Sequence, residues 1–279
     1  MSHAKRLLLA SLFAISASSV SAADLPPPPP PPPAGWIVTL GIGPNLFTSF
    51  PGASSVSLWP TGYITIHRPG EPEPFVSPDD GLGIALFDIG WVKAGPVARF
   101  ISQRTLSGGF GTIIGNNQNL FGLRDIGFTA EIGGFMEIWP AEFFRARFEA
   151  RQGISGARGF DANVSFDFIQ KYGLFTFSAG PRLQFADTRF VNAFFSVTPW
   201  EAFLNGNVTP YQATGGLTSV GGLGAIKYDF APSWSATAFG GVNRYVGSAG
   251  ASPIPLRLGS LDNFTAGVIA AYSFNWTGF

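Results

Sequence analysis

The charged side chains of this chain are few, and the densest group of them is regularly spaced. The stretch FFRARFEARQ at 143–152 has a charged residue at every second position: Arg145, Arg147, Glu149 and Arg151. The alternate positions are apolar: Phe144, Ala146, Phe148 and Ala150. In a β-strand, alternate residues share one face. Arginines and carboxylates on one face can pair with opposite charges or bind a charged solute.

Catalytic chemistry has little support in the sequence. His67 is the only histidine after residue 22, and cysteine is absent. A nucleophile needs a base within hydrogen-bonding reach, and no serine lies near His67 on the same strand face. One histidine and scattered carboxylates do not form a metal site. The glycine-rich GGFG at 108–111 lacks the strand–loop–helix context of a phosphate loop. We expect a non-enzyme with no cofactor or metal, in which His67 is structural.

The composition indicates an unusual environment. Charged residues make up 12% of the 279 residues and aromatic residues 15%, whereas a soluble domain carries about 25% charged residues. The formal net charge is zero, so no basic surface for nucleic acid is expected. Without cysteine there are no disulfides, and an N-terminal lipid anchor is excluded.

The N-terminus predicts export. Residues 1–22 combine Lys5 and Arg6, the apolar run LLLASLFAISASSV, and a small-residue cleavage site ending at Ala22. The alternative is an uncleaved membrane anchor, which the short apolar core disfavours. No later run of about 18 apolar residues predicts a transmembrane helix. A proline-rich segment follows at 23–35, which we expect in the periplasm as a stiff spacer or a docking segment.

Period-two alternation continues through much of the remaining sequence. We predict an all-β fold, a transmembrane antiparallel up-and-down β-barrel over 36–279, with a soluble β-sandwich as the alternative. Apolar faces about ten residues long, with aromatic residues near the strand ends, favour the barrel. Twelve strands are expected, with ten as the alternative. The twelfth comes from splitting 172–196 near Asp187 or from a longer strand in 72–88. The predicted strands are 36–47, 57–67, 82–89, 91–103, 125–138, 143–152, 159–168, 173–185, 217–230, 234–246 and 263–274.

In such a barrel the charged face points into the lumen. The predicted lumen charge network consists of Glu131, Glu137, Arg145, Arg147, Glu149, Arg151, Asp161, Asp167 and Arg182. Two residues directly opposite each other on neighbouring antiparallel strands point to the same side of the sheet. For both to point into the lumen here, their residue numbers must add up to an even value. For the strands 125–138 and 143–152 we predict the register in which the residue numbers of opposite residues add up to 282. This register places Glu137 opposite Arg145 and Glu131 opposite Arg151. Ion pairs would then brace the lumen.

One short helix is predicted within a long loop, at 198–206 (TPWEAFLNG). Thr198 is the expected N-cap, Glu201 completes a capping box, and Asn205-Gly206 ends the helix. Trp200 and Phe203 are expected to pack on a barrel rim or to enter the lumen.

Several stretches together resemble the MipA/OmpV family of outer-membrane proteins, over roughly 36–274. They are GPRLQFADTRFVNAFFSVTPWEAFLNGNVTPYQATGGLTSVGGLGAIKYDF, WSATAFGGVNRYVGSAGASPI and NFTAGVIAAYSF. The last resembles the family's closing strand, here with Phe264, Tyr272 and Phe274. The tail Asn275–Phe279 extends beyond the point at which the family normally stops.

The resemblance implies location and function. The chain is expected in the bacterial outer membrane, in contact with lipid and assembled by the barrel insertion machinery. The family's founding member is described as a scaffold linking a murein lytic transglycosylase to a penicillin-binding synthase. A non-enzymatic scaffold for peptidoglycan-remodelling enzymes is therefore the first expectation, and a passive small-solute channel is the second. An outer-membrane lipid hydrolase is disfavoured because His67 has no partner nucleophile.

Overall fold

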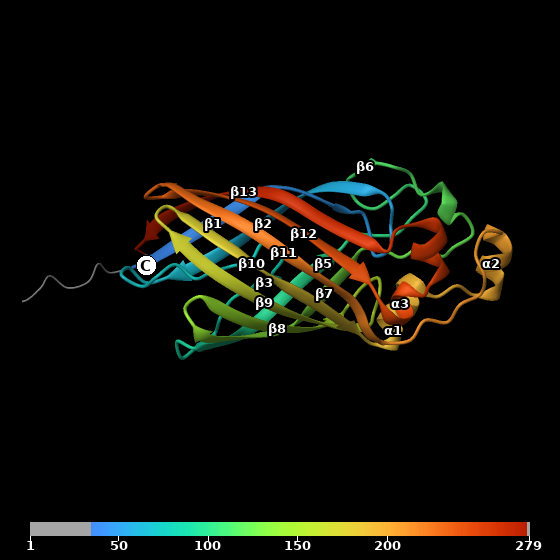
Figure 1. The fold of residues 1–279 in the computed structure, drawn as a ribbon, viewed down its shortest axis with the longest axis horizontal. Coiled ribbons are helices and arrows are strands. Elements are labelled where there is room, and N and C mark those ends of the chain that lie inside the picture. Colours follow the sequence, from blue (N-terminus) through green and yellow to red (C-terminus); the bar gives the residue numbers. More distant parts are fainter. Residues whose placement is uncertain (1–34, 278–279) are drawn as a thin grey trace, which may run out of the picture. The chain divides into compact units, whose positions relative to one another are not determined.

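The computed structural model describes residues 35–277. The predicted signal peptide at 1–22 and the proline run lie outside these residues. Ten long antiparallel strands form the wall (Figure 1). They are β1 (Trp36–Thr48), β2 (Val56–His67), β5 (Val92–Ile101), β7 (Thr129–Ala141), β8 (Phe144–Gly153), β9 (Phe160–Tyr172), β10 (Phe175–Ala186), β11 (Gly216–Ala231), β12 (Trp234–Tyr245) and β13 (Asp262–Trp276).

Three short strands complete the sheet: β3 (Leu82–Gly83), β4 (Phe87–Asp88) and β6 (Thr112–Ile114). Twelve strands follow one another in the order β3-β5-β7-β8-β9-β10-β11-β12-β13-β1-β2-β6, and β4 pairs with β5 beside β3. The prediction of a twelve-stranded antiparallel barrel is confirmed. β13 lies between β12 and β1, with Tyr272 opposite Leu40 and Phe274 opposite Val38.

The two ends of the barrel differ in their connections. Two-residue turns join β7 to β8, β9 to β10 and β11 to β12 at one end, which we call the short-turn end. Helices and long loops gather at the other, the long-loop end, on the right in Figure 1. The turn between β9 and β10 contains Gly173, whose φ of 59° is left-handed, a conformation that glycine adopts without steric cost.

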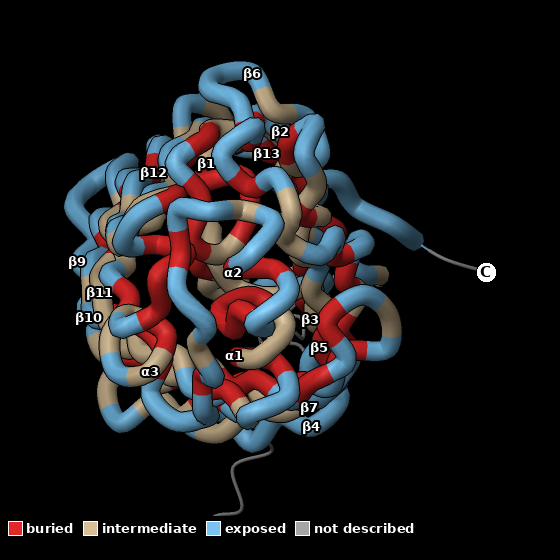
Figure 2. Tube along the Cα trace, turned by 90° about the vertical axis from the view of Figure 1, so that its right-hand side faces the viewer, coloured by how far each residue is buried: buried red, intermediate tan, exposed pale blue. Residues whose placement is uncertain are grey.

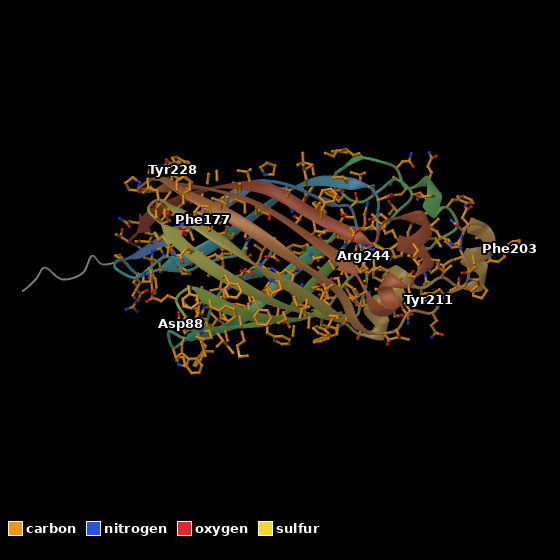
Figure 3. The ribbon with its side chains drawn as sticks, viewed as in Figure 1. Asp88, Phe177, Phe203, Tyr211, Tyr228 and Arg244 are labelled. Atoms are coloured by element: carbon orange, nitrogen blue, oxygen red, sulfur yellow. The ribbon has the colours of Figure 1, made fainter. Side chains whose placement is uncertain are left out.

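The wall is apolar outside and polar inside. On β8 the side chains of Arg145, Arg147, Glu149 and Arg151 are buried inward, while Phe148 is exposed on the outer surface. Aromatic side chains are exposed near the short-turn end, where Figure 3 shows Phe177 and Tyr228. The alternation predicted from sequence is therefore the orientation observed.

The predicted register between β7 and β8 is wrong by two residues. Glu137 lies opposite Arg147 and Glu131 opposite Gly153, so paired numbers sum to 284. The two-residue turn at 142–143 pairs Ala141 with Phe144, and a β-bulge between Ile138 and Ala141 then shifts the pairing to the observed register. The prediction did not include this bulge and assumed a register centred one residue earlier. Because the error is even, every side chain keeps its predicted face. Glu137 and Arg145 become diagonal neighbours, as do Glu131 and Arg151.

The segment after β10 is a helix, α1 (Thr188–Phe195), and not the second strand considered near Asp187. Asp187 caps the helix by accepting a hydrogen bond of 2.7 Å from the Phe190 backbone N–H. Phe190 and Phe194 are four residues apart, as are Val191 and Phe195, so a helix buries all four side chains together. A strand would have separated them onto two faces.

Helix α1 lies across the long-loop end of the barrel, in the centre of the ring of strands in Figure 2. Its side chains pack with residues from opposite parts of the wall, among them Ile126, Ala186 and Tyr245. We call the cluster of buried side chains around α1 the mouth plug; its members are Ile126, Ala157, Ala186, Phe190, Val191, Phe194, Phe195, Ala213, Tyr245 and Ala249.

The remaining helical elements also lie at the long-loop end. They are α2 (Pro199–Asn205), α3 (Gly247–Gly250), a 3-10 turn at Gln118–Leu120 and a π-helical turn at Ile254–Leu258. Within residues 35–277, no helix has the length and apolar character needed to cross a membrane.

Candidate functional site in the lumen

The lumen is filled at mid-height by paired charges that project mainly from β8. Arg145 is fully buried at 0% exposure and binds three carboxylates. Its Nη1 lies 2.7 Å from Asp80 Oδ2 and 3.2 Å from Glu137 Oε1, and its Nη2 lies 2.6 Å from Asp167 Oδ2. The guanidinium also stands over the Phe75 ring at 4.8 Å. Each donor of this side chain therefore has a partner, and the charge is held rigidly.

Arg147 repeats this arrangement two residues farther along β8, away from the short-turn end. It pairs with Glu137 and with Glu149, whose Oε1 lies 2.7 Å from Arg147 Nη2. Its guanidinium covers the Phe135 ring at 3.9 Å, a cation–π contact. The two arginines thus share Glu137 between them.

Arg151 forms the third pairing, nearer the long-loop end. It pairs with Glu149, reaches Glu131 Oε2 at 3.1 Å and donates to Asp161 Oδ2 at 2.6 Å. One oxygen each of Glu131 and Asp161 has no hydrogen-bond partner within the described residues. Carboxylate oxygens are therefore in excess at this level of the lumen.

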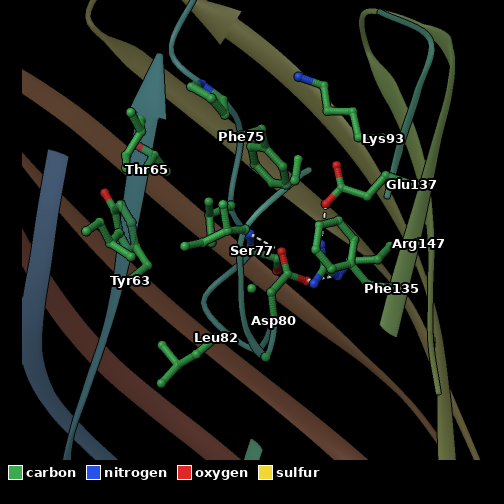
Figure 4. Close-up of a pocket in the computed structure, with 18 of the residues that line it drawn as sticks. Tyr63, Thr65, Phe75, Ser77, Asp80, Leu82, Lys93, Phe135, Glu137 and Arg147 are labelled. Carbon is green, nitrogen blue, oxygen red and sulfur yellow. Dashed lines mark hydrogen bonds and ion pairs between the residues drawn. The ribbon is translucent and has the colours of Figure 1, made fainter. Parts of the chain in front are cut away.

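The segment 76–81 completes the network, although its sequence did not predict a place inside the barrel. Residues 76–81 lie between β2 and β5 in the chain, yet they run through the lumen (Figure 4). Asp80 pairs with Arg145, and Asp79 Oδ2 lies 2.6 Å from Arg182 Nε. Arg99 donates to the Asp79 carbonyl at 2.6 Å and to Glu149 at 3.2 Å. The sequence feature that could have indicated this segment is the SPDDG motif at 77–81, in which the Ser77 backbone N–H donates to the Asp80 carboxylate and closes a turn.

All nine residues predicted for the lumen charge network are buried on the inner face. With Asp79, Asp80 and Arg99 they form what we call the lumen ion network, in which five arginines face seven carboxylates: Arg99, Arg145, Arg147, Arg151, Arg182; Asp79, Asp80, Glu131, Glu137, Glu149, Asp161, Asp167. The paired charges offset one another and brace the lumen, while the seven carboxylates exceed the five arginines by two formal negative charges.

The lumen opens below the network into a vestibule at the short-turn end. This cavity of about 790 Å³ is lined by Tyr63, Phe75 and Trp139 and by charged side chains of both signs. Lys227 pairs with Glu73 and lies 3.3 Å from Asp229. Lys171 and Glu142 lie at the rim of the same cavity. A cavity with aromatic walls and balanced charge suits an amphipathic or zwitterionic ligand.

The mouth plug closes the opposite end, and Arg104 holds it in place. Arg104 is 1% exposed and donates at 2.6 Å to the Phe194 carbonyl near the end of α1. It also donates to the Arg124 carbonyl at 3.2 Å. Burial, and then the neighbouring Arg124 charge, lower the pKa of Arg104 to about 10. A guanidinium at the carboxyl end of a helix satisfies carbonyls that the helix itself leaves free.

Helix α2 begins and ends as predicted, with the capping box of Thr198 and Glu201 and with Gly206 in the left-handed conformation, φ 73°. The predicted packing of its aromatic residues is wrong. Trp200 and Phe203 are 66% and 74% exposed, and their rings stack on each other with centroids 5.6 Å apart. The buried residues of α2 are Ala202, which lies in an apolar cluster, and Glu201, which forms a bidentate pair with Arg124 at 2.7 and 2.8 Å.

The residues considered for catalysis or metal binding do not converge. His67 is 8% exposed at the end of β2, and its Nδ1 has no partner within residues 35–277. In the same part of the chain, no group of three His, Asp or Glu side chains is arranged to hold a metal ion.

This combination of an apolar outer wall, inward charges, short turns at one end and long loops at the other defines a bacterial outer-membrane β-barrel. The family model of MltA-interacting protein MipA matches residues 40–274, and the chain belongs to this family. The protein lies in the outer membrane. Short turns mark the periplasmic side of such barrels and long loops the outer side.

Comparison with solved structures gives distant matches. An outer membrane channel from Pseudomonas putida F1 is 10% identical, with 87% of this chain and 96% of that chain covered and a TM-score of 0.45. The NanC porin is 9% identical, with 84% and 100% covered and a TM-score of 0.41. A comparison with curated proteins gives no match.

Proposed function

We propose that this protein is a non-enzymatic structural barrel that docks peptidoglycan-remodelling enzymes on the periplasmic side of the outer membrane. One observation carries the proposal: the long-loop end is closed by the mouth plug, whereas the short-turn end is open. Val191 and Phe194 in the plug are 0% exposed. A barrel closed to the outside and open to the periplasm is suited to periplasmic contacts more than to exchange across the membrane.

The rim of the vestibule supports a protein partner. Lys171 and Tyr172 are exposed at the short-turn end, beside the charged pair of Lys227 and Glu73. Protein interfaces combine aromatic residues with a polar, hydrogen-bonding rim. The family description names an interaction with MltA. The partner class proposed is therefore a murein lytic transglycosylase, together with a penicillin-binding synthase.

Site-specific cross-linking tests the docking side. The natural chain has no cysteine, so single cysteines can be placed at Lys171 on the short-turn end and at Asn207 on the long-loop end. Both positions are exposed. With a maleimide-photoreactive probe and the purified transglycosylase, we expect adducts from Lys171→Cys and none from Asn207→Cys. Equal yields at the two ends, or none at either, would contradict the proposal.

The second candidate is a passive small-solute channel, favoured by the size and charged lining of the vestibule. Conductance in planar bilayers separates the two, with heat-modifiable gel mobility as proof of folding. A folded wild-type barrel without discrete conductance steps agrees with the scaffold. Reproducible steps would show that the mouth plug opens and would favour the channel.

A further inference from the structure

The wall has one seam without hydrogen bonds, between β2 residues 59–67 and residues 82–89. The edge of β2 that faces away from β1 is paired only near the long-loop end, where Val56 and Ser57 pair with β6 and the Leu58 N–H donates to the Gly111 carbonyl at 2.9 Å. Within residues 35–277, no backbone hydrogen bond reaches this edge between Trp59 and His67. Backbone N–H groups of alternate residues point to the same side of a strand, and the Leu58 N–H points away from β1. The N–H groups of Gly62, Ile64 and Ile66 therefore also point away from β1, into the seam.

The opposite edge of the seam is unpaired as well. Residues 82–89 bind β5 on their far side, where Leu82 pairs with Ala98 and the Leu86 N–H donates to the Ala94 carbonyl at 2.9 Å. Their other side faces β2. Unpaired backbone groups are strongly unfavourable in hydrocarbon, so two facing free edges call for an occupant that can accept and donate hydrogen bonds.

A cavity lined by charged and apolar side chains lies directly behind the seam. It measures about 170 Å³ and touches both edges, at Gly62 to Ile66 and at Leu82 to Ala85. Figure 4 shows Tyr63 and Thr65 on one side of it, and Lys93, Glu137 and Arg147 on the other. Thr65 is 6% exposed, and its hydroxyl has no hydrogen-bond partner within the described residues. The cavity therefore holds an unsatisfied polar group next to charges of both signs.

The outer side of the seam is apolar. The exposed residues that flank it are Ile64, Ile66, Leu82, Ile84 and Leu86. In an outer-membrane barrel, an apolar outer band of this kind contacts the hydrocarbon of the bilayer. Inward, the cavity shares Tyr63, Phe75 and Lys93 with the vestibule, so it lies between the membrane and the periplasmic opening.

We propose that the seam is a lateral portal that binds one membrane phospholipid with a zwitterionic headgroup. The acyl chains stay along the apolar flanks, and the headgroup enters the cavity beside its charged side chains. Lys93, whose Nζ lies 3.0 Å from Asp88 at the cavity wall, faces the phosphate. Asp88 supplies negative charge for the ammonium group, and the cavity is also lined by Asp80 and Glu137, whose carboxylates pair with Arg145 and Arg147. The bilayer itself supplies this ligand at the seam, and both headgroup charges find complementary side chains.

A matched pair of exposed alanines tests the portal. Ala85 lines the cavity, whereas Ala266 is exposed on β13 and does not line it. Barrels are refolded into phosphatidylethanolamine–phosphatidylglycerol vesicles, extracted in mild detergent and weighed by native mass spectrometry. We expect one phosphatidylethanolamine retained by the wild type and by Ala266→Trp, and at least tenfold less on Ala85→Trp. Equal retention by the two variants, or none on the wild type, would overturn the portal.

A second measurement addresses the headgroup. Thr65→Val removes the unpartnered hydroxyl with little change in volume, and we expect it to lower phosphatidylethanolamine retention several-fold while the barrel keeps its heat-modifiable mobility. In equimolar vesicles the wild type should retain phosphatidylethanolamine several-fold over phosphatidylglycerol. Preference for phosphatidylglycerol, or no change with Thr65→Val, would overturn the proposed headgroup contacts.

Discussion

The lumen ion network and the mouth plug close the same barrel by opposite means. The network fills the middle with charged side chains from strands and from residues 76–81. The plug fills the long-loop end with apolar side chains around one helix. A charge that loses its partner in a buried site keeps its full desolvation cost, whereas an apolar side chain that is truncated leaves a cavity that neighbours can partly fill. The two regions should therefore respond differently to single substitutions.

The largest effect is expected from Arg145→Leu. This change leaves Asp80, Asp167 and Glu137 without their shared cation in a buried site. Removal of one partner from a buried ion pair costs about 3–5 kcal/mol, and three carboxylates are affected here. We expect a loss of about 5 kcal/mol in the free energy of unfolding, measured by urea titration in vesicles. Tryptophan fluorescence and gel mobility report the transition.

The control for this change is Arg244→Leu. Arg244 pairs with Asp262 at 2.9 Å, but the two side chains are 56% and 51% exposed (Figure 3). Exposed ion pairs contribute about 0–1 kcal/mol. Losses of similar size for the two arginines would show that the lumen is wet enough to screen its charges, and the contrast drawn above would fail.

A smaller effect is expected in the plug, from Phe194→Ala. Phe194 is 0% exposed and lies beside Phe190, with ring centroids 5.3 Å apart. Truncation of a buried phenylalanine costs about 3–5 kcal/mol, and we expect about 3 because Phe190 and Phe195 can collapse toward the gap. The same change should raise the frequency of conductance steps in planar bilayers, because it removes a side chain from the mouth plug that closes the long-loop end.

Phe203→Ala is the matched control, because Phe203 is 74% exposed on α2. It should change the free energy of unfolding by less than about 0.5 kcal/mol and should produce no conductance steps in planar bilayers. If Phe194→Ala destabilises the barrel without any conductance, a second barrier must lie in the lumen, and the ion network is the candidate.

The sequence predicted the wall far better than its contents. Alternation assigned every long strand within a few residues, and the inward face of β8 followed from Arg145, Arg147, Glu149 and Arg151. A strand in lipid must repeat this pattern along its whole length, so the signal is strong. The β7–β8 register was wrong by two residues because face alternation fixes only its parity.

The contents of the lumen depend on long-range packing that alternation does not encode. Residues 76–81 enter the barrel because Asp79 and Asp80 find arginines far away in sequence. The helix α1 was missed because a short apolar run reads equally well as a buried strand. Its N-cap, Asp187, was the available clue. Helix α2 was predicted because its capping box is local.

The smallest effect is expected from pH at α2, where Glu201 pairs with Arg124 of the segment before β7. Burial alone would raise the pKa of Glu201, but hydrogen bonds from Arg124 and the Thr198 backbone lower it to about 2. Because this pKa is depressed in the folded state, the stabilisation is present above the usual glutamate value near 4.5 and is lost as the pH falls toward 2. Arg124 is 40% exposed, so we expect the ionised Glu201 to contribute only about 1–2 kcal/mol of stability.

Proteolysis of the 197–215 loop at pH 5 and pH 3 measures this contribution, and the rate of cleavage should rise at pH 3 in the wild type. Glu201→Gln should be cleaved equally fast at both values, after correction for protease activity. A wild-type loop that resists cleavage at pH 3 would mean that the apolar contacts of Val197, Ala202 and Val208 hold it without the charge.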